Sequence, residues 1–388
     1  MKILLVCNYY QPQLAYAESE IARALTNAGH RVEVITGDLY FPFPNFDVTV
    51  KRVLKDRYVG TGKRVEKGIL VTRNKIFFEI FARSVYFGIN DKIKKYKPDI
   101  VITFGLSTPA NIQVSLSKFF HSFKYIGVDS HLPSELFSTN VLLKKIFYFL
   151  FRTLFSPIIA TSIDKIIAAQ EGTKDVITNY YGLTKNITVI SHGTNVDHYK
   201  FDKKLRSQIR KKYLLRNSDF VIIYTGKIIE SKGIDILTKA FAELASKYND
   251  MYLLLVGSGT ADYKEVCMNV IPKKYQNRVI WEEFQPYKVL PAFYSASDLA
   301  IWPLQESLSM NDAAACSLPL IVNDTVGVKE RLSNDNALLY KKGSHRDLFK
   351  KIEYLYSQPK RRLQMGKNGE RLVTTTLSWD SVAERYIS

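Results

Sequence analysis

The sequence has few of the features that are typical of secreted proteins, of proteins with structural metal sites and of membrane-spanning proteins. Its 388 residues include only three cysteines, Cys7, Cys267 and Cys316. Their odd number and wide spacing argue against a disulfide framework or a metal knuckle and fit a reducing compartment. No run of about 18 apolar residues occurs, so we expect no transmembrane helix. The apolar opening at 1–7 is too short for a signal peptide.

Acidic residues are also scarce relative to basic ones. There are 37 Asp and Glu residues against 55 Lys and Arg residues, a formal net charge of +18, and such an excess attracts polyanions. The lysines are scattered, and the sequence lacks a helix-turn-helix pattern, zinc-ligand spacing and an aromatic RNA-binding signature. We therefore expect anionic lipid or phosphorylated ligands as partners, and no nucleic acid.

What the chain does contain is a strand–helix alternation that occurs twice. Its length and hydrophobic content of 46% suit two domains of roughly 150–200 residues. Short apolar runs predict parallel strands, and amphipathic helices are expected at 18–25 and 234–247. The expected strands are 2–8, 31–36, 99–104, 124–129, 165–169 and 187–191, then 219–226, 251–257, 278–281, 299–302 and 318–322.

This pattern predicts an α/β protein with two Rossmann-like, doubly wound parallel-sheet domains facing a cleft. We expect an N-terminal domain at 1–195 and a C-terminal domain at 196–365. The helix-like segment 366–388 is expected to pack back on the first domain. The polar turn 191–197 is interpreted as a hinge in preference to a catalytic segment.

Candidate ligand-binding residues follow strands, where an open parallel sheet binds its ligands. Gly226 permits a tight turn after 219–225, and Lys227 and Lys232 then place two cations before a helix N-terminus, which suits a diphosphate. A solvated lysine loop is the alternative. Gly257 lies in a Gly-Ser-Gly stretch that admits a nucleotide or merely turns the chain.

The loop after 299–302 carries acidic groups that can accept hydrogen bonds from sugar or ribose hydroxyls. Glu306 lies in this loop, and a small-residue helix is expected to start near Ser309, where Ser309 or Asp312 alternatively caps the helix. In the first half, His131 follows the strand at 124–129, so it either contacts the reacting sugar or has a structural role.

These segments, in this order, resemble the retaining GT-B glycosyltransferases of glycosyltransferase family 4. The similarity spans nearly the whole chain, and no single motif carries it. The segments that carry it are 8–12 (NYYQP), 28–37 (AGHRVEVITG), 97–101 (KPDIV), 191–197 (SHGTNVD), 224–227 (YTGK) with 230–233 (ESKG), 294–298 (YSASD) and 313–321 (AAACSLPLI).

The resemblance implies that the domain at 1–195 binds the acceptor and that the domain at 196–365 binds the nucleotide sugar. It also implies roles for several residues. Lys227 and Lys232 would bind the donor diphosphate and stabilise the leaving group, and His131 would lie near the donor sugar. Retention by front-face attack needs no protein nucleophile, cofactor or metal. The donor would be a UDP- or GDP-sugar, and the acceptor a saccharide or a polyprenyl-diphosphate-linked glycan. The implied acceptor-side residues are Tyr10, Tyr16 and Asp129.

The chain departs from the family in its acidic signature, two glutamates with seven residues between them. Asp312 falls at the second position and Leu304 at the first, whereas Glu306 stands only six positions before Asp312. Either the loop is shortened, or Glu306 and the amides of 307–309 have taken over the sugar contacts. The donor-binding set is therefore Gly226, Lys227, Lys232, Gly257, Ser307, Leu308, Ser309 and Asp312, with His131, Lys227, Lys232 and Glu306 as catalytic candidates.

The segment 141–155 is strongly apolar and aromatic, and its basic residues are Lys144, Lys145 and Arg152. Such a helix either lies in the interface of an anionic membrane or is buried against the first sheet. The first interpretation makes this a cytoplasmic protein peripheral to the inner face of the plasma membrane.

Two other functions fit the same architecture, since a fold does not fix a reaction. One is a sugar-nucleotide epimerase or a phosphorylase, although the sequence shows neither an acid–base set nor a pyridoxal-bearing lysine. The other is a non-catalytic nucleotide-sugar-binding protein. A plain dehydrogenase is excluded because the first strand–helix loop lacks Gly-x-Gly-x-x-Gly.

Overall fold

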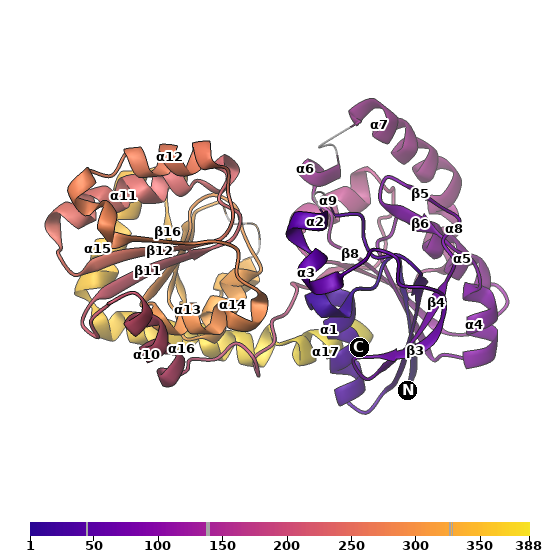
Figure 1. The fold of residues 1–388 in the computed structure, drawn as a ribbon. Helices are drawn as coiled ribbons and strands as arrows, with labels where there is room; N and C mark the ends of the chain where they lie inside the picture. Colours follow the sequence, from indigo (N-terminus) through magenta and orange to yellow (C-terminus); the bar gives the residue numbers. More distant parts are fainter. Residues whose placement is uncertain (44–45, 137–139, 326, 328) are drawn as a thin grey trace. The chain divides into compact units, whose positions relative to one another are not determined.

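The computed structural model describes residues 1–43, 46–136, 140–325, 327 and 329–388. The chain folds as two compact units (Figure 1): unit 1 is Met1–His192 with Trp379–Ser388, and unit 2 is Gly193–Ser378. The first crossing between the units, at 192/193, lies inside the segment 191–197 that the sequence marks as a hinge. The second crossing is at 378/379.

Unit 1 is built on an eight-stranded sheet in the order β10-β9-β8-β7-β1-β2-β4-β3. All neighbouring strands are parallel except β3 and β4, which form an antiparallel hairpin. The strand order reverses between β1 and β7, so this is a doubly wound sheet with a ligand-binding edge at that point. The strands are β1 Lys2–Cys7, β2 Arg31–Gly37, β3 Gly62–Glu66, β4 Ile69–Asn74, β7 Ile100–Phe104, β8 Lys124–Asp129, β9 Lys165–Ala168 and β10 Ile187–Val189.

Side chains of β1 alternate between two cores, one on each face of this sheet. Leu4 and Val6 pack in one cluster, whereas Ile3, Leu5 and Cys7 pack in the other. Helix α1 packs against α17 on the second face, and α5 packs against α4 and α8 on the first. The helices are α1 Ala17–Asn27, α2 Phe46–Thr49, α3 Lys51–Leu54, α4 Ile89–Tyr96, α5 Pro109–Lys118, α6 Pro133–Leu136, α8 Ser156–Ser162, α9 Glu171–Asn179 and α17 Trp379–Ile387.

The apolar segment 141–155 is a helix with one face buried and one face exposed. It comprises α7, Val141–Leu150, and a π-helical turn, Phe151–Phe155. Tyr148 and Phe151 are buried, but Leu142 is 72% exposed and Phe149 is 67% exposed. Burial in the core therefore accounts for only part of its apolar surface.

Unit 2 has a six-stranded, wholly parallel sheet in the order β13-β12-β11-β14-β15-β16. In chain order this is 3-2-1-4-5-6, the Rossmann order, with the reversal between β11 and β14. Figure 1 shows α11, α12 and α15 on one side of the sheet and α10, α13, α14 and α16 on the other. The strands are β11 Phe220–Thr225, β12 Met251–Val256, β13 Val279–Glu282, β14 Leu299–Trp302, β15 Leu320–Asn323 and β16 Ala337–Tyr340. The helices are α10 Lys203–Lys212, α11 Ile234–Lys247, α12 Ala261–Asn269, α13 Leu290–Ala296, α14 Ser309–Ala315, α15 His345–Ser357 and α16 Pro359–Thr376.

The C-terminal segment differs from the expectation that all of 366–388 packs on the first domain. Helix α16 belongs to unit 2, where it packs against α14, and only Trp379–Ser388 belongs to unit 1. Lys124 and Lys165 donate hydrogen bonds from Nζ to the carbonyls of Ile387 and Arg385, both at 2.8 Å. Cations at a helix C-terminus are favourable, which explains why α17 is held against unit 1.

Candidate functional site

The predicted donor residues of unit 2 gather where the strand order of its sheet reverses. The loop 226–233 follows β11, and the loop 303–308 follows the neighbouring strand β14. The Lys232 ammonium donates to the Glu306 carbonyl at 3.4 Å, and the Leu304 amide donates to the Lys232 carbonyl at 3.3 Å. Two segments more than 70 residues apart therefore form one polar edge, at the position where a doubly wound sheet binds its ligand.

Glycines let the neighbouring loops after β11 and β12 touch. Gly226 has φ +144°, Gly257 has φ +153°, and a Cβ on Gly257 would lie 1.8 Å from the Gly226 carbonyl oxygen. No side chain fits that space, so the close approach requires glycine. Tyr224 donates its hydroxyl to the Lys227 carbonyl at 2.8 Å, while the Lys227 side chain is exposed. The turn thus fixes the backbone of Lys227 and leaves its ammonium accessible.

Glu306 is held from two sides by the segment that follows β15. One carboxylate oxygen accepts the amide of Gly327, and the other lies 3.6 Å from the Arg331 guanidinium. Arg331 is 6% exposed. Burial lowers the pKa of Arg331 despite the carboxylates of Glu306, Glu330 and Asp312 nearby. These contacts orient the Glu306 carboxylate and place a charge-paired cation behind it.

The structure explains why Leu304 replaces an acid at the first signature position. A Cβ on Gly233 would lie 2.6 Å from Leu304 Cγ, so the leucine packs directly against the start of α11. An apolar side chain suits this contact. The acid of this loop is therefore Glu306, on the polar edge beside Lys232.

The three residues after Glu306 form a small hydroxyl cluster before α14. Ser307 Oγ and Ser309 Oγ lie 2.7 Å apart, and Ser309 Oγ donates to the Thr225 carbonyl at 3.4 Å. Leu308 between them is 44% exposed. The serines thus lie at the ends of β11 and β14, as the donor-site prediction requires of them.

Asp312 is not part of this cluster. Its carboxylate accepts a hydrogen bond from the Thr194 hydroxyl, on the segment that opens unit 2. Burial raises the pKa of Asp312 to about 7, against the opposing effects of the Thr194 hydrogen bond and the Arg331 charge. Its observed contact ties α14 to residue 194, and donor contact by Asp312 stays a prediction.

In unit 1, His131 and Asp129 form one hydrogen-bonded pair after β8. Asp129 Oδ1 lies 2.8 Å from His131 Nδ1 and accepts the His131 amide at 2.9 Å, while Oδ2 accepts the Leu106 amide at 2.8 Å. Burial by itself would raise the pKa of Asp129, but the His131 charge and these hydrogen bonds hold it below its usual value. Asp129 is 2% exposed, so it positions His131 and the loop after β7.

The two tyrosines assigned to the acceptor side differ in accessibility. Tyr16 is 41% exposed, and its ring lies 6.2 Å from that of Phe43. Tyr10 is 1% exposed, packs in the core on the α1 face, and accepts a hydrogen bond on its carbonyl from Arg73 at 2.8 Å. Tyr10 therefore supports the edge of the sheet and is unsuited to contact an acceptor, because its ring fills the core.

Two family models match the chain one after the other. Glycosyltransferase Family 4 matches residues 19–198, and Glycosyl transferases group 1 matches residues 206–372. The chain belongs to the GT-B glycosyltransferases. The resemblance drawn from the sequence motifs and the doubly wound α/β architecture are thereby confirmed.

Individual relatives of this GT-B chain are distant. The capsular polysaccharide biosynthesis glycosyltransferase CapM of Staphylococcus aureus is 26% identical over 57% of this chain and 60% of its own length. A GDP-mannose-dependent alpha-(1-6)-phosphatidylinositol monomannoside mannosyltransferase of Mycolicibacterium smegmatis is 22% identical over the same two shares. The structure of Anabaena HepE in complex with UDP is 16% identical, with a TM-score of 0.68 over 99% of this chain and 98% of that one.

The chain thus spans about 60% of the length of these curated relatives. Their names favour a glycosyltransferase over the epimerase and the non-catalytic alternatives. The similarity to HepE, at its low identity, shows the GT-B fold alone.

Sequence reasoning missed two residues of this site, Arg331 and Thr194. Arg331 lies on a single helical turn, Lys329–Leu332, and Thr194 lies in the segment interpreted only as a hinge. Neither has a sequence signal, because each acts through a contact with a residue distant in the chain. Nothing short of the tertiary arrangement could reveal them.

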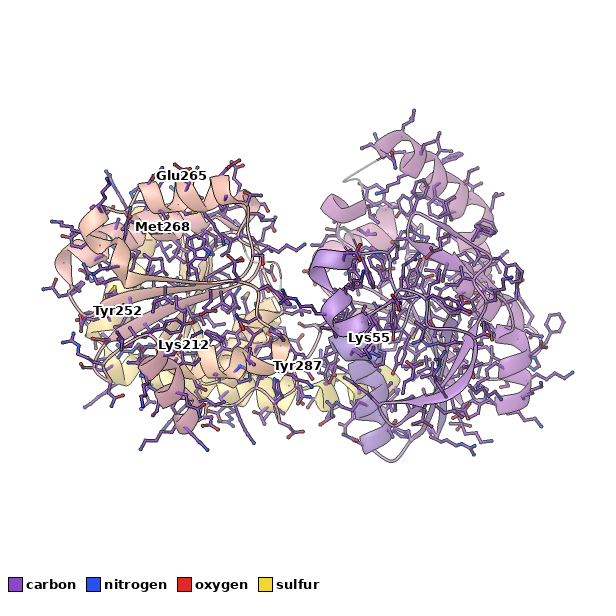
Figure 2. The ribbon with its side chains drawn as sticks, in the orientation of Figure 1. Lys55, Lys212, Tyr252, Glu265, Met268 and Tyr287 are labelled. Carbon is purple, nitrogen blue, oxygen red and sulfur yellow. The ribbon has the colours of Figure 1, made fainter. Side chains whose placement is uncertain are left out.

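Other features of the GT-B chain lie apart from this edge. A shallow hollow of about 390 Å³ in unit 2 is lined by α12 and β13 residues, among them Glu265 and Met268, both labelled in Figure 2, and it contains no predicted site residue.

Among the residues with described positions, no group of three or more His, Cys, Asp or Glu could hold a metal ion. Within the same ranges no helix is long and apolar enough to cross a bilayer. All three cysteines are buried and free.

Proposed function

We propose that this chain is a retaining glycosyltransferase that transfers a sugar from UDP- or GDP-sugar to a saccharide or lipid-linked saccharide in surface-glycan synthesis. The observation that carries the proposal is the polar edge of unit 2, where the loop of Lys227 and Lys232 lies at the reversal of the strand order and Lys232 contacts Glu306. Cations and backbone amides at such an edge suit the diphosphate of a nucleotide sugar.

The chemistry assigned to these residues is charge stabilisation. The bond between the anomeric carbon and the diphosphate breaks as the acceptor oxygen bonds to the same face of that carbon. The acceptor proton passes to the departing phosphate oxygen. Lys227 and Lys232 would neutralise the leaving diphosphate, which is the role that fixed cations serve at a developing anion. Glu306, oriented by Gly327 and Arg331, would accept hydrogen bonds from donor hydroxyls.

His131 is proposed to contact the donor sugar from unit 1. Its ring is oriented by the buried carboxylate of Asp129, and its side chain is 41% exposed. Tyr16 is the acceptor-side candidate that remains accessible.

The acceptor is proposed to be membrane-linked, with the protein peripheral on the cytoplasmic face of the membrane. Support comes from the exposed apolar side chains of 141–155 together with the cations Lys144, Lys145 and Arg152. An amphipathic helix with such a composition partitions into an anionic interface. The phosphatidylinositol mannoside relative acts, by its name, on a lipid-bearing sugar.

The proposal is tested by thermal shift with a panel of nucleoside diphosphates and nucleotide sugars, followed by transfer assays on lipid-linked and free saccharides. We expect UDP or GDP to raise the melting temperature, because a ligand that binds only the folded state stabilises it by mass action. The matching nucleotide sugar should then yield a glycosylated product with the anomeric configuration of the donor. Free nucleotide with no transfer to any acceptor, or an inverted product, would contradict the proposal.

A further inference from the structure

A second apolar element lies beside 141–155 in unit 1. It is the hairpin of β5, Phe78–Ile80, and β6, Arg83–Val85, whose strands are antiparallel. Phe77, Phe78 and Ile80 are 62%, 58% and 43% exposed. Phe87, 57% exposed, meets Phe77 edge-on at 5.1 Å. Single exposed apolar residues are ordinary, but contiguous ones mark an interaction surface.

The hairpin and α7 lie side by side in unit 1 (Figure 1). The rings of Phe81 and Phe147 lie 5.8 Å apart, edge to face. Arg83, which is 7% exposed, donates to the Tyr148 hydroxyl at 2.8 Å and lies 5.0 Å over the ring of Phe147. We define the apolar face as the exposed apolar side chains of 77–87 and 141–155. They are Phe77, Phe78, Ile80, Phe87, Val141, Leu142, Leu143, Ile146, Phe149, Leu150, Leu154 and Phe155.

The hairpin is also fastened to the ligand-binding edge of the unit 1 sheet. Asn8, just after β1, donates to the Ala82 carbonyl at 3.0 Å and accepts the Ser84 amide at 2.8 Å. Tyr9 donates its hydroxyl to Glu79 of β5 at 2.5 Å. Because β1 borders the point where the strand order reverses, the apolar face begins beside the acceptor-side residues.

Basic residues predominate along the two elements of the apolar face. Residues 140–163 contain no Asp or Glu, and the hairpin's one acid, Glu79, is paired with Tyr9 and Arg57. Lys75, Lys144, Lys145 and Arg152 supply cations. Aromatic side chains bordered by lysine and arginine suit the headgroup region of a bilayer that carries anionic lipid.

We propose that the hairpin inserts into the same anionic bilayer as 141–155 and holds the carboxyl end of β1 at the membrane surface, where a lipid-linked acceptor is delivered. The proposal rests on the membrane-linked acceptor of the proposed function. It adds an element far from 141–155 in the sequence, and it predicts which end of the sheet faces the lipid.

The first experiment is depth-dependent quenching. Phe78→Trp and Phe120→Trp variants of the full chain are mixed with vesicles that contain about 30% anionic lipid and brominated acyl chains, with lipid in excess over protein. Tryptophan fluorescence is measured, because bromine quenches a tryptophan that enters the bilayer. Phe120 is 81% exposed but precedes β8, at the opposite end of the sheet. We expect strong quenching of Trp at 78 and none at 120. Equal quenching at both positions, or quenching only at 120, overturns the proposal.

The second experiment compares Phe77→Ser/Phe78→Ser with the matched control Phe119→Ser/Phe120→Ser. Vesicle flotation should show at least about tenfold weaker partitioning for the hairpin variant and no change for the control, because two large aromatic side chains lose their burial in lipid. The affinity for UDP and GDP should be unchanged in both variants. Measuring it alongside flotation distinguishes an error in the proposed donor site from an error in the proposed membrane surface. If the wild-type face instead pairs two chains, gel filtration will show a dimer that the hairpin variant abolishes, and the lipid proposal is wrong.

Discussion

Replacing Lys232 with alanine is the sharpest test of the donor edge. The Lys232 ammonium has a hydrogen bond of 3.4 Å to the Glu306 carbonyl and is only partly buried. Its removal should therefore lower the unfolding free energy by no more than about 1 kcal/mol. A bound diphosphate would give the ammonium a charge-assisted contact instead, worth about 1.5–3 kcal/mol. That loss corresponds to an affinity for UDP or GDP about 10- to 150-fold weaker.

The measurement is isothermal titration of the diphosphate that wild type binds, with chemical denaturation run on the same samples. Lys273→Ala is the matched control because this substitution also removes one positive charge from unit 2. Lys273 precedes β13, so it lies at the opposite end of the sheet. The control should bind like wild type. Undiminished diphosphate affinity in Lys232→Ala, or an equal loss of affinity in both variants, would refute the proposal that the diphosphate binds at the carboxyl ends of the unit 2 strands.

Three further outcomes follow from the packing around this edge. Glu306→Gln removes the carboxylate beside the buried Arg331 guanidinium, so the unfolding free energy should fall by about 1–3 kcal/mol. Adding Arg331→Met should restore stability in chemical denaturation but should not restore glycosyl transfer. Recovery of transfer in the double variant would show that the Glu306 carboxylate is only structural. Burial raises the pKa of Asp312 to about 7, so between about pH 4 and 7 the folded state retains a proton that the unfolded state has released. Asp312 should therefore make the unfolding free energy fall as pH rises through this range, by up to about 1.4 kcal/mol per pH unit. Asp312→Asn should remove this contribution from denaturation curves, whereas buried Glu18, whose pKa is also raised to about 7, keeps its own. Gly257→Ala should lower the melting temperature well beyond Gly343→Ala, because both have positive φ but only Gly257 would press a Cβ onto backbone; equal melting temperatures would contradict the close approach.

Within each unit, charge pairing fixes some polar groups and leaves others exposed. Asp129 is buried with its partners satisfied, and Arg331 is buried beside Glu306. The exposed ammonium of Lys227 has no such enclosure. Fixed charges keep their geometry in a low-dielectric setting, whereas an exposed lysine is able to follow a ligand.

Strands that are buried on both faces were predictable from the sequence. The runs at 2–8, 219–226 and 251–257 became β1, β11 and β12 because continuous apolar stretches bounded by turns leave few other structures. The predicted helix at 234–247 matches α11, whose bounds are Ile234–Lys247. The hairpins β3–β4 and β5–β6 and the edge strand β16 were not predicted, since their exposed residues weaken the apolar signal.

The sequence by itself determined the two doubly wound halves, the order of the polar loops after the strands, and the excess of positive charge. Those properties depend on neighbours along the chain, so local patterns carry them. Only the tertiary structure decided that Leu304 packs on Gly233, that Glu306 lies beside the buried Arg331, that Tyr10 is buried, and that most apolar side chains of 141–155 are exposed. Each of these depends on contacts between segments distant in sequence, which the pattern of a single segment does not contain.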